Sequence, residues 1–106
     1  MVSERPPVFL FAGSDSYSKE KAINSLVSSA LDSSSRELDL KVLRGDHTSA
    51  REILDAVATI PFLAPQRFVI VREFDELPDE DRSRVIGYAK KPLKSACLVL
   101  EMKSDA

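Results

Sequence analysis

The sequence contains few of the residues from which metal sites and nucleophilic centres are built. Its 106 residues include one cysteine, one histidine and no tryptophan. The single cysteine, Cys97, excludes an internal disulfide, and one cysteine with one histidine is too few for a zinc site. His47 has no second histidine and no evident nucleophile as a partner, so we interpret it as a loop residue. We therefore expect no metal and no cofactor.

The chain also lacks an excess of positive charge and a long apolar run. Fifteen basic residues stand against seventeen acidic ones, which gives a net charge of −2. No basic field is available to hold a phosphate backbone, so DNA is expected only as an indirect partner. Residues 1–7 are polar, and no apolar run approaches the roughly 18 residues that span a membrane. We expect a cytoplasmic protein without membrane contact.

Four short apolar segments are typical of β-strands, and they are residues 8–12, 38–42, 68–71 and 96–100. The first and third are apolar throughout, which predicts strands buried on both faces, as in parallel sheets. In the second, leucine and valine alternate with Asp39 and Lys41, which predicts an edge strand with one dry face and one wetter face. Cys97 lies inside the fourth segment and is expected to be a small buried apolar residue.

Apolar residues at helical spacing lie between these segments and predict three helices. The first helix begins near Tyr17 and ends in a loop at residues 32–35, and the second follows a capping box of Ser49 and Glu52. The third begins near Pro78, and its buried stripe is expected at Val85, Ile86, Ala89 and Leu93. Because strands and helices alternate strictly, the predicted fold class is α/β, a three-layer parallel sheet with helices on both faces in one domain over residues 1–106.

The turn after the first predicted strand is where such a sheet would bind phosphate. Aligned with the phosphate-loop pattern G-x-x-x-x-G-K-[ST], Gly13 and Lys19 match. Ser18 replaces the second glycine, and Glu20 replaces the hydroxyl that binds magnesium. The glycine lets backbone N–H groups curl around phosphate, and a carboxylate at the last position would repel it. The segment is therefore interpreted as a degenerate phosphate loop.

The carboxylate that would orient Mg²⁺ just after the third strand is missing as well. Arg72 stands there, and Glu73 is one residue late, on the opposite side of the strand. Arg72 equally replaces the aspartate that a phospho-acceptor site would need besides Asp15. The acidic residues within 73–81 are interpreted as a solvated loop and a helix start. We expect no catalytic residue, and one alternative stays open: a divergent P-loop-type NTPase or phosphate-binding switch domain using Lys19.

The link between the second helix and the third strand, residues 59–67, combines two prolines with large apolar side chains. The prolines stiffen it and exclude it from regular ladders. Loops run over the surface, where their backbone groups need water, so a polar sequence is the ordinary case. This loop instead carries Ile60, Phe62 and Leu63. Either these side chains fold back onto the domain or they are presented to another molecule.

Three segments in this order, residues 8–17, 60–71 and 97–101, resemble the N-terminal domain of the delta subunit of the bacterial clamp loader, within the DNA polymerase III holoenzyme. The most specific parts are the Gly-x-Asp-x-Tyr turn that begins at Gly13 and the Pro-Phe-Leu-x-x-x-Arg passage that begins at Pro61. The resemblance implies an AAA+-like domain without ATPase activity. Its task in the family is to bind the ring-shaped sliding clamp, the beta subunit, and to open it.

The same resemblance implies which residues contact the clamp. In the family an apolar pair at the end of the second main helix enters a pocket on the clamp. Phe62 and Leu63 match this pair, and Ile60 is a flanking contact. Clamp-binding peptides often carry a glutamine four residues before the first of the pair, but Ala58 occupies that place here. Binding is therefore expected to depend on apolar burial.

The resemblance also implies parts that this sequence does not contain. The family's full chain has a lid and a collar that joins the other loader subunits. The AAA+ sheet places a fifth strand beside the first, and this sequence ends after the fourth. Residues 8–12 would then be a bare apolar edge, which proteins normally avoid. We expect the 106 residues to be one domain of a longer chain, lacking its fifth strand and meeting other loader subunits through regions absent here.

Overall fold

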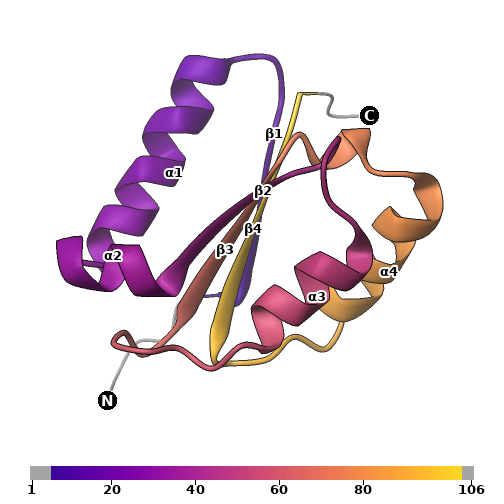
Figure 1. Cartoon of the computed structure of the whole chain (residues 1–106). Helices are drawn as coiled ribbons and strands as arrows, with labels where there is room; N and C mark the ends of the chain where they lie inside the picture. Colours follow the sequence, from indigo (N-terminus) through magenta and orange to yellow (C-terminus); the bar gives the residue numbers. More distant parts are fainter. Residues whose placement is uncertain (1–5, 104–106) are drawn as a thin grey trace.

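Four parallel strands form one sheet in the computed structural model, which describes residues 6–103. Residues 1–5 of the polar N-terminal segment lie outside this range. The strands lie in the order β1-β4-β3-β2, with bounds β1 Val8–Ala12, β2 Leu40–Arg44, β3 Arg67–Arg72 and β4 Ala96–Met102. The helices are α1 Ser16–Ala30, α2 Ser33–Asp39, α3 Ala50–Ala58 and α4 Asp79–Ala89, with a short 3₁₀ helix η1 at Phe74–Glu76. Helices α1 and α2 cover one face of the sheet and α3 and α4 cover the other (Figure 1). The predicted three-layer α/β fold is confirmed.

The two central strands, β3 and β4, supply most of the core. Successive side chains of a strand point to opposite faces of the sheet. Val69 and Leu98 accordingly pack in the cluster on the α3 and α4 side, whereas Phe68 and Cys97 pack with α1. All four side chains are buried. Their apolar segments, residues 68–71 and 96–100, are buried on both faces, as the sequence predicts for the first of the two.

Strand β1 differs from its prediction, because it is buried on only part of its surface. In the described part of the chain it pairs with β4 alone and forms one edge of the sheet. Phe9 and Phe11 stack on the α1 side, with ring centroids 6.2 Å apart. Leu10, on the opposite side, is mostly exposed. The expectation of a bare apolar edge is confirmed, and the expectation of full burial is wrong.

The loop predicted at residues 32–35 is instead the start of helix α2. Asp32 caps this helix, because its side chain accepts a hydrogen bond from the Ser35 N–H at 2.8 Å. The helix continues through Asp39, so β2 begins at Leu40 and the expected alternation is lost. Val42, predicted on the dry face, is half exposed, whereas Asp39, predicted on the wetter face, is fully buried.

Helices α3 and α4 begin where the sequence predicts. The Ser49 hydroxyl accepts a hydrogen bond from the Glu52 N–H at 3.2 Å, while the Glu52 carboxylate accepts one from the Thr48 hydroxyl instead of completing the box. Helix α4 follows Pro78 directly. Its predicted buried stripe is partly wrong: Val85 is buried and Ala89 is half-buried, but Ile86 and Leu93 are exposed. None of the helices within residues 6–103 has the length and apolar character needed to cross a membrane.

Candidate functional site

The turn between β1 and α1 is shaped by backbone conformation and capping. Gly13 has a φ of +125°, in the region that favours glycine. Asp15 caps α1: its carboxylate accepts hydrogen bonds from the Ser18 N–H at 3.0 Å and from the Ser18 hydroxyl at 2.8 Å. These two bonds from Ser18 are the main reason that the pKa of Asp15 lies below its ordinary value. Ser18, at the place of the second phosphate-loop glycine, thus serves the helix cap.

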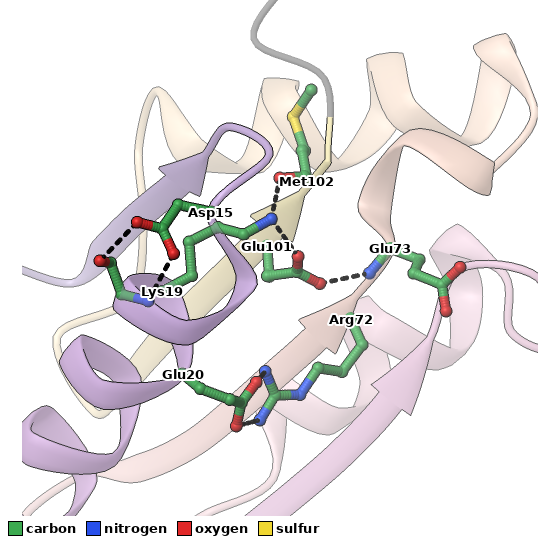
Figure 2. A network of polar contacts seen from close by, with 8 residues as sticks. Asp15, Lys19, Glu20, Arg72, Glu73, Glu101 and Met102 are labelled. Atoms are coloured by element: carbon green, nitrogen blue, oxygen red, sulfur yellow. Dashed lines mark hydrogen bonds and ion pairs between the residues drawn. The ribbon is translucent and has the colours of Figure 1, made fainter.

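Lys19 is buried and bonded to the last strand of its own chain. Its Nζ donates to Glu101 Oε2 and to the Met102 carbonyl oxygen, both at 2.6 Å (Figure 2). Burial alone would raise the pKa of Glu101, but the bonds from Lys19 and from the Glu73 N–H lower it below its ordinary value, and the charge of Arg72 adds to this. Glu101 is therefore an ionised partner for Lys19 at neutral pH. The ammonium group of Lys19, which would bind a phosphate in a phosphate loop, is thus paired with the carboxylate of Glu101.

The other charged residues at this end are paired in the same way. Arg72 makes a two-point ion pair with Glu20, in which Nη2 lies 2.9 Å from Oε1 and Nη1 contacts Oε2. Glu73 has a φ of +51°, and its N–H donates to Glu101 Oε1 at 3.0 Å. Its carboxylate turns away from Lys19 (Figure 2) and binds Arg44 Nη2 at 2.6 Å. Arg72 and Glu73 thus have structural partners, as do Lys19 and Glu20 of the degenerate phosphate loop.

A small cleft of about 180 Å³ remains at these carboxyl ends of the strands. It is lined by the paired residues named above, together with Ser16 and Lys103. Within residues 6–103, no group of three His, Cys, Asp or Glu side chains is placed to hold a metal ion. His47 is exposed in the loop after β2, with Nε2 3.5 Å from Asp46 Oδ2, which fits its interpretation as a loop residue.

The opposite end of the sheet carries the apolar loop between α3 and β3. We call its three large apolar side chains, Ile60, Phe62 and Leu63, the wedge. Their exposed fractions are 82 %, 74 % and 55 %. In Figure 1 the loop runs past the amino end of β3, away from the β1–α1 turn. Of the two alternatives left open by the sequence, this exposure excludes folding back onto the domain.

Two charged side chains hold this loop in place, the buried Asp39 and the half-buried Arg67. The carboxylate of Asp39 accepts hydrogen bonds from the backbone N–H groups of Phe62, Leu63 and Ala64, at 2.5, 2.7 and 2.7 Å. Arg67, at the start of β3, donates from Nε to the Ala56 carbonyl oxygen at 3.0 Å. The sequence analysis missed Asp39, because it placed this residue on the wetter face of a strand. A signal was present in Asp32, a favourable N-cap residue before a short helix that ends at Asp39.

Comparison with known proteins gives one family and several solved structures. The family model described as "DNA polymerase III, delta subunit" matches residues 9–105. The comparison with curated protein sequences gives no match.

Two solved structures share the fold. The chain is similar to the Bacillus subtilis DNA clamp loader delta protein YqeN, with a TM-score of 0.83 and 19 % identity over 94 % of this chain and 32 % of that one. It is also similar to a DNA polymerase III gamma subunit-related protein from Thermotoga maritima, with a TM-score of 0.70 and 17 % identity over 95 % of this chain and 36 % of that one. The chain therefore spans about a third of the length of each. Since the family model covers nearly all of the sequence, the chain belongs to the DNA polymerase III delta subunit family.

Proposed function

We propose that this chain is the clamp-binding domain of a clamp-loader delta subunit, and that it binds the sliding clamp through Phe62 and Leu63 with Ile60 beside them. The observation that carries the proposal is the exposure of these three apolar side chains on a loop whose backbone is fixed. Large apolar side chains that are exposed together mark protein interaction sites. The family and the clamp-loader fold of the similar structures point to the clamp as the partner.

The size of the wedge is sufficient for a specific contact. Burying a Phe or Leu side chain contributes roughly 1.5 to 3 kcal/mol, so this pair offers a gross contribution of about 3 to 6 kcal/mol before ordering costs. Two such residues can dominate an interface. Pro61 and Pro65 flank the pair and restrict the unbound loop. Affinity for the clamp then depends on apolar burial. Ala58, at the place where clamp-binding peptides often carry a glutamine, offers no side-chain hydrogen bond.

Ring opening needs no hydrolysis by this domain. A subunit favours the open ring if it binds that conformation better than the closed one. The paired charges at the carboxyl ends of the strands support a subunit without ATPase activity, because Lys19 and Arg72 bind carboxylates of their own chain. We propose that residues 1–106 act as one domain of a longer cytoplasmic subunit of the DNA polymerase III holoenzyme. Other loader subunits would be met through other parts of that subunit, and DNA only indirectly.

The alternative of a P-loop-type NTPase or phosphate-binding switch requires the ammonium group of Lys19. That group lies in a buried ion pair with Glu101. A phosphate would have to displace a carboxylate and the Met102 carbonyl oxygen. No observation in residues 6–103 favours this alternative, so we do not propose it.

A titration of the protein with the sliding clamp of its own species tests the proposal. The variant Phe62→Ser/Leu63→Ser removes the apolar pair, and we expect at least a hundredfold loss of affinity, about 2.7 kcal/mol. Both side chains are exposed, so the circular dichroism spectrum and thermal midpoint should change little. The matched control is Ile86→Ser/Leu93→Ser, which removes two exposed apolar side chains, one in α4 and one in the segment after it, and should bind as the wild type does. Unchanged affinity in the wedge variant would refute the proposed function.

A further inference from the structure

Three consecutive backbone N–H groups converge on one buried carboxylate. Asp39 is fully buried at the end of α2. Its Oδ1 accepts from Phe62, and its Oδ2 accepts from both Leu63 and Ala64. The residues that donate lie 23 to 25 positions further along the chain. The contact is therefore a tertiary one, and it joins α2 to the segment that carries the wedge.

Such an arrangement restricts the backbone strongly. Successive N–H groups that point at one anion form a concave nest, and hydrogen bonds to an ionised acceptor are stronger than neutral ones. Burial alone would raise the pKa of Asp39, but the three N–H groups and the charge of Arg67 lower it below its ordinary value. The carboxylate is thus ionised at neutral pH. Its charge is compensated mainly by the loop that it holds.

The prolines and the carboxylate act on complementary parts of the loop. A proline ring fixes φ only for its own residue. Pro61 and Pro65 therefore fix φ at none of the three residues between them, Phe62 to Ala64, although Ala64 is restricted as the residue before a proline. These are the three residues whose N–H groups bind Asp39. Together the two devices restrain every residue from 61 to 65.

Arg67 joins the elements between which this contact is made. Its Nε donates to the Ala56 carbonyl oxygen in α3, and its Nη1 donates to the Leu38 carbonyl oxygen in α2 at 3.3 Å. One guanidinium thus joins the helix before the loop, the strand after it and the helix that carries Asp39. The carboxylate and the loop are therefore held at a fixed mutual position.

We propose that Asp39 is a positioning residue for clamp binding: its buried carboxylate holds residues 62–64 in the conformation that presents Phe62 and Leu63 before the partner arrives. This inference rests on the proposed function of the wedge. A preordered loop loses less conformational entropy on docking than a free one, so the carboxylate raises affinity without touching the clamp.

The variant Asp39→Asn tests the inference. Asparagine keeps the size of the side chain but removes the charge and places an NH₂ donor against N–H donors. We expect at least tenfold weaker clamp binding and at least tenfold faster hydrogen exchange of the amides of Phe62, Leu63 and Ala64. The matched control is Asp32→Ala, which removes the cap of the same helix without contacting the loop. In the control, clamp affinity per folded molecule should change less than threefold.

The possible results separate this inference from the proposed function. If Asp39→Asn binds as the wild type does while Phe62→Ser/Leu63→Ser does not bind, the role of Asp39 is refuted and the wedge stands. If the wild type does not bind the clamp, both fail. Exchange in the wild type gives a test that needs no variant to fold. If the amides of residues 62–64 exchange as fast as unprotected loop amides, the positioning role is refuted.

Discussion

The two ends of this parallel sheet use charge in opposite ways. At the carboxyl ends of the strands, charged side chains bind one another: Lys19 with Glu101, and Arg72 with Glu20. At the amino end of β3, the buried carboxylate of Asp39 binds backbone, and the exposed side chains beside it are apolar. One end therefore pairs its own polar groups, while the other holds a loop so that its large apolar side chains stay exposed to solvent. The carboxyl ends of the strands, where such sheets usually bind ligands, thus carry ion pairs within the chain.

The largest effect on stability is expected from the ion pairs at the carboxyl ends of the strands. Lys19→Met leaves Glu101 buried without its counter-ion, and removal of one partner of a buried pair costs about 3 to 5 kcal/mol. Urea unfolding should show this loss, while the folded protein keeps its affinity for the clamp. Lys21→Met on the same helix is the control, because Lys21 is exposed and the change should stay within about 0.5 kcal/mol. Equal stability of Lys19→Met and wild type would contradict the assigned role of the pair.

Acid should lower the stabilising contributions of Glu101 at one end of the sheet and of Asp39 at the other. The folded-state pKa values of Glu101 and Asp39 lie below their ordinary values of 4.5 and 3.8. A carboxylate with a lowered folded-state pKa contributes stability that is complete above its ordinary pKa and is lost as the pH falls through the folded-state value. Urea unfolding should therefore show a nearly constant free energy of unfolding from pH 7 to about 5 and a decline below about 4.5.

The variants Glu101→Gln and Asp39→Asn assign this decline to one end or the other. Each removes one of the two carboxylates, so each should have a shallower decline between about pH 4.5 and pH 3 than the wild type. In the wild type, protonation of Asp39 should also lower the protection factors of the amides of residues 62–64, and the Asp39→Asn variant should lack this dependence on pH. If the decline has the same slope in both variants and the wild type, other carboxylates cause it and this comparison between the ends fails.

A smaller effect, on clamp affinity, is expected from the prolines of the loop between α3 and β3. Pro61→Ala gives the loop more freedom, and such a change is worth about 0.4 to 1 kcal/mol. Clamp affinity should therefore fall about two- to fivefold, as measured by titration. Asp39→Asn should cost more, because the carboxylate restrains three residues and the proline one. A larger loss in Pro61→Ala than in Asp39→Asn would show that the imino ring, and not the carboxylate, is the main restraint.

The parts of the fold that the sequence predicts are those with a local signal. Phe68 to Val71 are apolar throughout because both faces of β3 are covered, so four consecutive residues identify a central strand. Two prolines likewise exclude the loop of Phe62 and Leu63 from the sheet, although the sequence left open whether these side chains fold back or are exposed. Strand β1 is equally apolar, yet among residues 6–103 it is an edge of the sheet. Its position depends on which strands the chain supplies, and the run of residues itself does not contain that information.

The parts that could not be predicted depend on distant partners. Helix α2 has seven residues, three of them serine, and little apolar periodicity, so its cap at Asp32 was the only local indication. Asp39 lies between two leucines, as a polar residue of an edge strand would, and only its contact with Phe62 to Ala64 reveals its role. Lys19 was identified, but its partner Glu101 lies 82 residues away. A single sequence shows neither pairing.

The parallel direction of the four strands has a consequence for how the molecule responds to salt. All loops that follow a strand lie at one end, and those that precede a strand lie at the other, so the length of β3 separates them. Six residues at about 3.3 Å each make this distance about 20 Å, about two and a half times the Debye length at physiological ionic strength. Salt screens charges, so it weakens the partly exposed pair of Arg72 and Glu20 and does not screen the uncharged side chain of Phe62. Ionic strength is therefore a means of perturbing the ion pairs at one end of the domain without changing the apolar side chains at the other.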